Sequence, residues 1–433
     1  MKKYDEYKDS GVAWIGEVPK HWEVRKIKTL SSVKRGASPR PIDDPKYFAE
    51  DGEFSWVRIA DVSVSDKYLT STTQKLSELG SSLSVKRFPG DIFISIAGTV
   101  GKPIISSIKC CIHDGFVYFP YLKNMNTEFL YYIFMSGQPY LGLGKMGTQL
   151  NLNTETIGNI DIPYPPITVQ TAIATYLDTH CAKIDNLISI QQKRIALLQE
   201  LKQSVITHAV TKGLNPNVEM KQSGVEWIGE VPKHWEVIKT SLAFQGIGSG
   251  TTPSTSKKEY YDDNGKYWLQ TGDLEDGIVY DTSKKVSNIA IKECNLTFYP
   301  IDSIIIAMYG ATIGKVGILG IESATNQACC VIPVTKKRIA KYFFYEFLAC
   351  KPALLIAAIG GGQPNISQDI IKKLKVVMPP ISEQAAIASY LDHKCATIDT
   401  SISNAQHQIE LLQEYKQSLI TEVVTGKRKV TDN

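Results

Sequence analysis

The sequence contains a long heptad pattern that occurs twice, at about residues 168–211 and again at about residues 382–425. In both stretches apolar residues return at alternating steps of three and four, the spacing of a coiled-coil seam that requires a partner. Each stretch begins with a hydroxyl residue after a Pro-Pro-Ile motif, and a glycine lies just past its end, as is common for helices. We therefore predict two helices, each about 60 Å long. The predicted seam residues are Leu177, Ile184, Ile188, Ile195, Leu198 and Val205, and then Leu391, Ile398, Ile402, Ile409, Leu412 and Leu419.

The two predicted helices also share residues outside the seam. Residues 176–178 (Tyr-Leu-Asp) return at 390–392, and residues 197–200 (Leu-Leu-Gln-Glu) return at 411–414. Two explanations remain open: a shared surface on which partner subunits dock, or a recent duplication that left surface residues unchanged. The docking candidates are Tyr176, Asp178, Gln199, Glu200, Tyr390, Asp392, Gln413 and Glu414.

A second repeat lies before each helix. Residues 10–24 read SGVAWIGEVPKHWEV and residues 223–237 read SGVEWIGEVPKHWEV, so that only Ala13 and Glu226 differ. The chain is therefore a tandem duplication of a unit of roughly 210 residues. We expect the tryptophans of this segment to be packing anchors rather than a binding platform; they are Trp14, Trp22, Trp227 and Trp235.

The composition suits a chain of two or three globular domains. Of the 433 residues 43% are hydrophobic and 21% are charged, and the net charge of +4 permits nucleic acid as a partner without arguing for it. No apolar run follows Met1, and the longest apolar candidate, residues 304–307, is expected to be a buried strand. Eight cysteines without any CxxC spacing indicate reduced core thiols. We expect a soluble cytoplasmic protein without a membrane partner.

Between the repeats lie two divergent segments, residues 26–164 and 239–378, which are typical of short strands and a few helices. Strands are predicted, for example, at 54–59 and 267–271, and helices at 127–135 and 339–349. The two segments match at three glycine-containing landmarks, which pair 35–39 with 250–254, 98–102 with 311–315, and 147–151 with 361–365. Similar flanks around divergent middles indicate one scaffold that carries two specificities.

These patterns predict an α+β fold with two related mixed α/β domains joined by the long helices. The predicted divisions are 1–165 for the first domain, 166–212 for its helix, 213–378 for the second domain, 379–427 for its helix, and 428–433 for a tail.

A search for catalytic motifs finds none. Residues 310–315 resemble a phosphate loop, but three rather than four residues separate the glycines, and Val316 stands where Ser or Thr would bind magnesium. The sequence has no GxSxG elbow, no HExxH motif and no acidic run at metal-ligand spacing. The Pro-Pro motifs lack the Asn or Asp and the aromatic residue of an amino-methyltransferase. We therefore expect no catalysis, no cofactor and no metal.

Binding is a better explanation for the landmarks. Glycine-rich turns let backbone N–H groups approach phosphates, and the polar side chains around them suit phosphate oxygens or base edges. The alternative for each residue alone is an ordinary turn or a solvated lysine. The DNA-binding candidates are Arg35, Ser38, Arg40, Thr99, Lys102, Lys145, Gln149, Asn151, Thr251, Thr252, Gln270, Thr312, Lys315, Gln363 and Asn365.

Over essentially its whole length the chain resembles the specificity subunit of type I restriction–modification enzymes. The resemblance rests on the paired WIGEVPKHWEV segments, the GTVGK and ATIGK turns, the Gly-rich Gln-Asn elements, and the Pro-Pro-Ile helices with Gln170 and Gln384. It departs from that family at Val169, where the second copy has the family-like Glu383. We expect this loss of a helix-dipole contact to cost a few tenths of a kcal/mol.

The resemblance implies that the two divergent segments are target recognition domains, each of which reads one half of an asymmetric bipartite site in double-stranded DNA. It also implies that the helices form an antiparallel coiled coil with pseudo-two-fold symmetry, which sets the spacer and docks two methyltransferase subunits. Restriction/translocase subunits would complete the enzyme. Two other readings stay open: an enzyme with an unrecognised motif, and a coiled-coil scaffold that binds proteins only.

Overall fold

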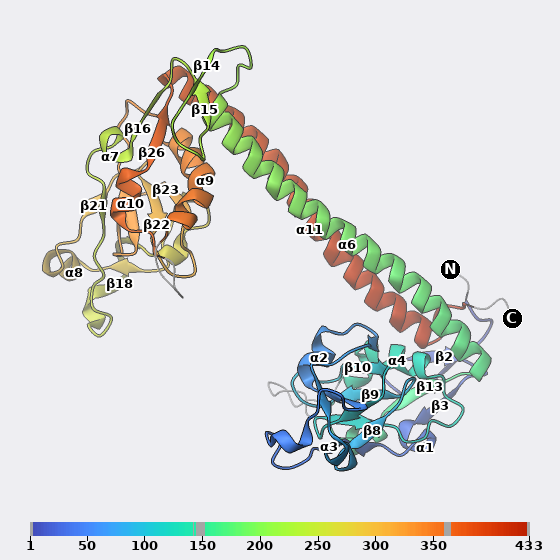
Figure 1. Cartoon of the computed structure of the whole chain (residues 1–433). Coiled ribbons are helices and arrows are strands. Elements are labelled where there is room, and N and C mark those ends of the chain that lie inside the picture. The colour runs from blue at the N-terminus through green and yellow to red at the C-terminus, as the bar shows by residue number, and fades with distance from the viewer. Residues whose placement is uncertain (1–2, 142, 144–151, 359–364, 431–433) are drawn as a thin grey trace. The chain divides into compact units, whose positions relative to one another are not determined.

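The computed structural model describes residues 3–141, 143, 152–358 and 365–430, and its contacts divide the chain into two compact units. Unit 1 comprises Met1–Gln191 with His407–Asn433, and unit 2 comprises Gln192–Gln406 (Figure 1). Each unit therefore contains one globular domain together with a part of each long helix.

Unit 1 is built on two mixed sheets and two short antiparallel pairs. The five-stranded sheet has the order β4 (Lys34–Arg35), β12 (Phe116–Tyr118), β9 (Ile92–Ser95), β10 (Pro103–Ser106), β6 (Tyr68–Leu69). The four-stranded sheet has the order β7 (Gln74–Leu76), β5 (Phe54–Val57), β11 (Cys110–Ile112), β8 (Val85–Arg87). The pairs are β1 (Tyr7–Asp9) with β2 (Glu17–Pro19), and β3 (Glu23–Lys26) with β13 (Asp161–Tyr164). The short helices are α1 (Ile27–Leu30), α2 (Ile59–Val64), α3 (Glu78–Ser82), α4 (Thr127–Met135), α5 (Thr154–Gly158), η1 (Pro45–Tyr47) and η2 (Gln138–Tyr140).

Unit 2 repeats this topology strand for strand. Its five-stranded sheet has the order β17 (Gly248–Ser249), β25 (Cys329–Ile332), β22 (Ile304–Ala307), β23 (Val316–Leu319), β19 (Gly277–Val279). Its four-stranded sheet has the order β20 (Lys285–Val286), β18 (Tyr261–Leu269), β24 (Ser323–Thr325), β21 (Phe298–Tyr299). The pairs are β14 (Met220–Gln222) with β15 (Glu230–Pro232), and β16 (Glu236–Lys239) with β26 (Lys375–Met378). Its short helices are α7 (Thr240–Ala243), α8 (Asn288–Glu293), α9 (Ala340–Ala357), α10 (Gln368–Lys373), η3 (Lys258–Tyr260) and η4 (Thr271–Asp273).

Most predicted short elements are present, with shifted ends. Helix α4 has the predicted bounds, and β22 is a buried strand as expected. The strand predicted at 54–59 ends at Val57, because α2 begins at Ile59. The strand predicted at 267–271 is the end of the longer β18, and η4 follows it. Helix α9 continues to Ala357, beyond its predicted end, and contains Pro352 in its interior.

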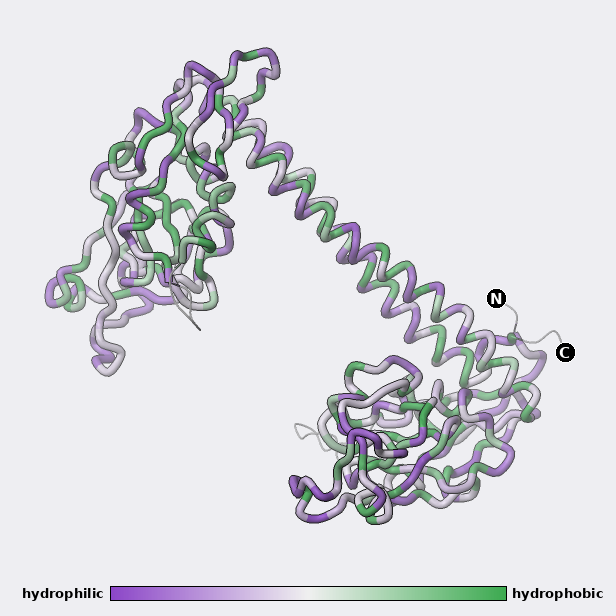
Figure 2. The backbone as a smooth tube through the Cα atoms, viewed as in Figure 1, coloured by the Kyte–Doolittle hydropathy of each residue, from purple (hydrophilic) through white to green (hydrophobic). Residues whose placement is uncertain are grey.

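The two long helices are α6 (Ile167–Lys212) and α11 (Ile381–Val424), as the heptads predict. In unit 1 the early part of α6 packs on the late part of α11, and Lys416 Nζ lies 2.7 Å from Asp185 Oδ1. In unit 2 the late part of α6 packs on the early part of α11, and Lys202 Nζ lies 2.7 Å from Asp399 Oδ1. The pairing is therefore antiparallel. All predicted seam residues are buried or half-buried, and polar and apolar residues alternate along both helices (Figure 2).

The repeated tryptophan segment closes the C-terminal end of a long helix in each unit. In unit 1 a Cβ placed on Gly426, just after α11, would lie 2.5 Å from Pro19 and 3.0 Å from the ring of Trp22. In unit 2 a Cβ on Gly213, just after α6, would lie 3.1 Å from the ring of Trp235. Both glycines have a φ of +76°. Trp22 and Trp235 are fully buried, as expected for packing anchors.

The difference between Val169 and Glu383 has a larger consequence than a helix-dipole contact. In unit 2 Trp235 Nε1 donates to Glu383 Oε2 at 3.0 Å, and His234 Nε2 lies 2.8 Å from Glu383 Oε1. In unit 1, where Val169 replaces the glutamate, Trp22 Nε1 is buried and has no hydrogen-bond partner among the described residues. The expected cost of a few tenths of a kcal/mol counted only the helix dipole. Unit 1 also contains a buried indole N–H without the acceptor that unit 2 provides.

Replacing Glu383 with alanine is expected to lower the free energy of unfolding by about 1–2 kcal/mol, because Trp235 Nε1 would lose its acceptor. The matched control is Val169→Ala, which changes the equivalent position of unit 1 without removing a hydrogen bond and should cost less than about 1 kcal/mol. Urea unfolding followed by tryptophan fluorescence would measure both. Equal losses in the two variants would contradict the role assigned to Glu383.

Candidate nucleic-acid interface

In unit 1 the ends of four strands meet at one edge of the domain. The parallel strands β5 and β11 end at Val57 and Ile112, so the segments after them lie side by side. Strand β9 ends at Ser95, which is paired with the first residue of β12, Phe116. The last residue of β4, Arg35, lies opposite Val117. We call the resulting surface the loop edge of unit 1; it consists of residues 36–40, 58–63, 96–102 and 113–115 together with Arg35.

Backbone contacts join these loops to one another. Ala37 N donates to Ile112 O at 3.1 Å, and Ile96 N donates to Gly115 O at 2.8 Å. A Cβ on Gly36 would overlap the carbonyl oxygen of His113, so only glycine allows the first loop to approach the 113–115 loop this closely. The Ser63 and Thr99 hydroxyl oxygens lie 2.6 Å apart and connect two further loops. The loop edge is thus one continuous surface rather than four separate loops.

An arginine cluster stands on this edge around Asp114. Arg40 Nη2 donates to Asp114 Oδ2 at 3.0 Å, and Ser38 Oγ donates to Asp114 Oδ1 at 3.2 Å. Arg35 Nε donates to the Asp114 carbonyl oxygen. Partial burial alone would raise the pKa of the Asp114 carboxyl, but the Ser38 hydroxyl and the charges of Arg40 and Arg35 hold that pKa below its usual value. Asp114 thus remains ionised and orients two exposed arginines, and the sequence alone did not single it out.

A further arginine, Arg58, follows β5 on the same edge and was also missed. Its backbone N donates to Asp61 Oδ2 at 2.9 Å, its guanidinium donates to the Thr73 hydroxyl, and 43% of its side chain is exposed. The equivalent residue in unit 2 is Gln270, whose backbone N donates to Asp273 Oδ2 at 2.8 Å. Both units share one sequence pattern at 56–61 and 268–273: a Trp, then an aliphatic residue, and an Asp five residues after the Trp. This pattern could have identified Arg58.

Lys102, one of the predicted DNA-binding residues, is bonded within the unit. Its Nζ donates to the carbonyl oxygens of Ser63 and Ser65 at 3.0 and 2.6 Å, and burial lowers its pKa. This lysine therefore fastens the end of α2 to the 96–102 loop. Thr99, by contrast, is exposed on the loop edge.

Unit 2 presents the same edge with different chemistry. We define its loop edge as residues 250–254, 270–273, 308–315, 326–328 and Asn365. The 308–315 turn matches its counterpart, because Gly314 N donates to Ala307 O at 2.9 Å where Gly101 N donates to Ser95 O at 2.8 Å in unit 1. The predicted polar residues on this edge are exposed or half-buried; they are Thr251, Thr252, Gln270, Thr312, Lys315 and Asn365.

Two amides on this edge were not predicted. Asn326 and Gln327 follow β24 where His113 and Asp114 follow β11 in unit 1. Gln327 N donates to Thr252 Oγ1 at 3.5 Å, and Asn326 Oδ1 accepts from Ala328 N at 3.2 Å. Hydroxyls and amides thus occupy positions that hold arginines and an aspartate in unit 1. Four of the predicted residues lie outside the described part of the chain: Lys145, Gln149, Asn151 and Gln363.

The docking candidates on the helices differ in whether they are bonded within their own unit. Asp178 accepts from Tyr132 OH and Lys67 Nζ, both at 2.5 Å, while Asp392 accepts from Tyr345 OH at 2.9 Å and Lys341 Nζ at 2.6 Å. These two aspartates thus anchor each globular domain to its helix. Tyr176 stacks on His180 at 3.8 Å between ring centroids. The remaining candidates are exposed: Gln199, Glu200, Tyr390, Gln413 and Glu414.

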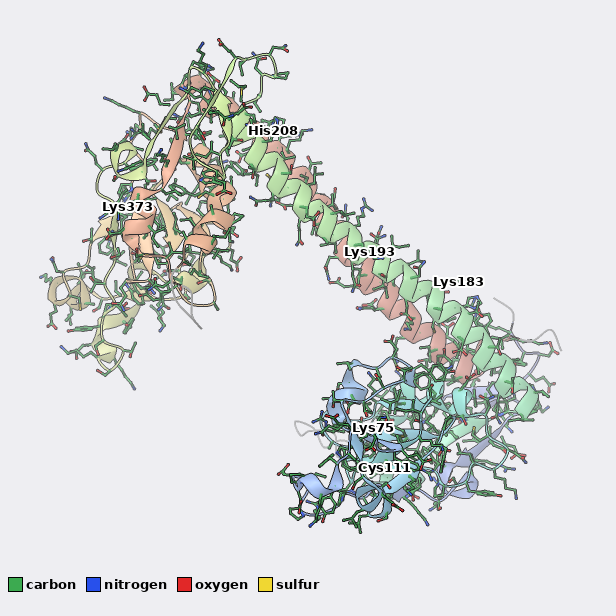
Figure 3. All side chains as sticks on the ribbon, viewed as in Figure 1. Lys75, Cys111, Lys183, Lys193, His208 and Lys373 are labelled. Atoms are coloured by element: carbon green, nitrogen blue, oxygen red, sulfur yellow. The ribbon has the colours of Figure 1, made fainter. Side chains whose placement is uncertain are left out.

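Large apolar side chains are exposed beside these polar residues. In unit 2 Leu197 is 64% exposed and Leu201 is 49% exposed, and in unit 1 Leu411 is 50% exposed and Tyr415 is 48% exposed. Lys183 and Lys193 are also exposed on α6 (Figure 3). Of the repeated Leu-Leu pairs, the second leucine belongs to the seam and the first faces outward. These exposed apolar side chains therefore occur at equivalent places in both helices.

The described residues offer neither a metal cluster nor a membrane-spanning helix. They contain no cluster of three or more histidine, cysteine, aspartate or glutamate side chains arranged to hold a metal ion. Within the same residues, no helix is both long and apolar enough to cross a membrane. All eight cysteines are free thiols.

Comparisons with known proteins agree with this architecture. A family model described as the type I restriction modification DNA specificity domain matches residues 19–200 and 232–411. The type I restriction enzyme MjaIX specificity subunit of Methanocaldococcus jannaschii is 23% identical over 428 residues, which cover 96% of each chain. The EcoKI specificity subunit of Escherichia coli is 22% identical over 444 residues, which cover 95% of this chain and 90% of that one.

A solved structure shares the fold. A chain from work on complex assembly and conformational transition of the type I R-M system has a TM-score of 0.73 at 14% identity, covering 94% of this chain and 98% of that one. The two matched blocks of the family model each contain one loop edge, and together they account for most of the sequence. The chain therefore belongs to the type I restriction–modification DNA specificity domain family.

Proposed function

We propose that this chain is the DNA-reading subunit of a type I restriction–modification complex. Residues 1–165 and 213–378 are its two target recognition domains, and each reads one half of an asymmetric bipartite site in double-stranded DNA. The helices at 166–212 and 379–427 set the spacer between the half-sites, and 428–433 form a short tail. The complex acts in the cytoplasm, where its DNA substrate lies.

One observation carries this proposal: the same loop edge occurs in both units but with different polar side chains. Unit 1 offers Arg35, Arg40 and Arg58, whereas unit 2 offers Thr251 and Gln270 at corresponding strand ends. Arginine, amide and hydroxyl side chains are the groups that hydrogen-bond to base edges and phosphates. Two unlike surfaces on one scaffold favour two unlike half-sites rather than a palindrome.

We further propose that the subunit is not itself an enzyme and that it docks two methyltransferase subunits, with restriction/translocase subunits completing the complex. The exposed leucines and amides at 197–200 and 411–414 favour such docking, because they occur at equivalent places in both helices. Membership of a DNA specificity family argues against the alternative of a scaffold that binds proteins only.

The test is single-molecule sequencing of methylated bases in DNA from cells that express this chain with its cognate methyltransferase subunit. The expected result is a bipartite asymmetric motif that disappears when this chain is omitted. Methylation that continues unchanged without the chain would refute the proposal. Binding of S-adenosylmethionine or base modification by the purified chain alone would instead favour the enzyme alternative.

A further inference from the structure

The residue that follows the tryptophan strand is held in the same way in both units but differs in its side chain. Arg58 in unit 1 and Gln270 in unit 2 each follow directly after a strand that pairs in parallel with its neighbour, and each precedes a short helix. In both units the backbone N–H of this residue is held by a carboxylate three residues later, Asp61 or Asp273, at 2.9 and 2.8 Å. The backbone position is thus the same, and what changes is the chemistry that it presents.

The surroundings of this position are also shared. The tryptophan two residues earlier is buried in both units, Trp56 at 3% exposure and Trp268 at 0%. Both units thus keep the buried tryptophan and the aspartate that accepts from the backbone N–H, while the residue that makes this bond, Arg58 or Gln270, differs. We expect this arrangement where two domains bind different targets.

The two side chains match different bases. Arginine offers only donors and pairs with the O6 and N7 acceptors of guanine, whereas glutamine offers a donor and an acceptor and pairs with N6 and N7 of adenine. Arg58 is held in place before any ligand arrives, because its guanidinium is bonded to the Thr73 hydroxyl and lies 3.9 Å from Asp61. Its side chain is nevertheless 43% exposed, and it stands on the loop edge next to the turn that carries Thr99.

From this geometry we propose that Arg58 and Gln270 are specificity-determining residues that occupy one equivalent reading position in the two half-sites. Arg58 selects a guanine in the half-site of unit 1, and Gln270 selects an adenine in the half-site of unit 2. Asp61 and Asp273 are positioning residues, because each holds the backbone from which the reading side chain projects. This inference rests on the proposed function and adds which residue reads which base.

The experiment uses the complete chain co-expressed with its methyltransferase subunit and determines the methylated motif by single-molecule sequencing. Arg58→Gln is expected to change one base of one half-site while leaving the other half-site and the spacer unchanged. At the original motif methylation should fall on the order of 10- to 100-fold. The reciprocal variant, Gln270→Arg, is expected to change one base of the other half-site. Two variants in different units keep the test informative if one of them folds poorly.

The matched control is Arg25→Gln, which removes an exposed arginine of unit 1 that lies on β3, outside the loop edge. It should leave the motif unchanged. Retention of the wild-type motif at full efficiency by both Arg58→Gln and Gln270→Arg would overturn the inference. A loss of binding that is equal for all DNA sequences, together with a reduced salt dependence, would also overturn the inference, because that result identifies a phosphate contact. If the wild-type chain itself directs no motif, the proposed function fails instead.

Discussion

Replacing Trp235 with alanine is expected to lower the free energy of unfolding by about 3–5 kcal/mol. The indole is fully buried, packs against Gly213 at the end of α6, and donates its N–H to Glu383 near the start of α11. One side chain thus joins both long helices and the repeated segment of unit 2. Since a folded domain is stable by only about 5–15 kcal/mol, this loss is a large part of the total. Thermal or urea unfolding of the purified chain would measure it.

The matched control for this prediction is Trp227→Ala. Trp227 lies in the same repeated segment but is only half-buried, so its loss should cost clearly less. Hydrogen exchange would localise the effect, and faster exchange is expected in residues 205–240 of the Trp235 variant. An equal loss of stability in the two variants would mean that Trp235 does not hold the helix ends together.

Inserting one extra heptad into each long helix is expected to change the spacer of the recognised site and to leave both half-sites unchanged. The insertions belong after Gln191 and after Gln406, where both helices pass from one unit to the other. The pairs Asp185–Lys416 and Lys202–Asp399 then keep their partners within their own units. Seven residues lengthen a helix by about 10 Å, which corresponds to at most roughly three base pairs of B-DNA.

The measurement is again the methylated motif, determined for the wild-type and the lengthened chain. Insertion into one helix only is the control, because it puts the two seams out of register and should reduce methylation at every site. A lengthened chain that methylates the original motif, or that keeps the spacer and changes the half-site bases, would contradict the proposal that the helices set the spacing.

The sequence by itself determined the parts of this protein that depend on neighbouring residues. The helices α6 and α11 follow from a local heptad period, and their ends from the prolines before them and the glycines after them. The duplication determined that both units share one topology. The burial of Trp22 and Trp235 was expected because a large apolar ring beside Pro and Gly tends to pack.

Only the tertiary structure decided which polar residues gather into one surface. Arg40 and its partner Asp114 are 74 residues apart in the chain, and Arg58 reaches the same edge because β5 and β11 are parallel neighbours. Lys102 was predicted as a DNA-binding residue from its place in a glycine-containing turn, and only the structure shows that its Nζ is bonded within the unit. Sheet order and side-chain partners arise from long-range contacts that no local pattern encodes. The heptads therefore predict the helices, whereas each loop edge exists only once distant strand ends have been brought together.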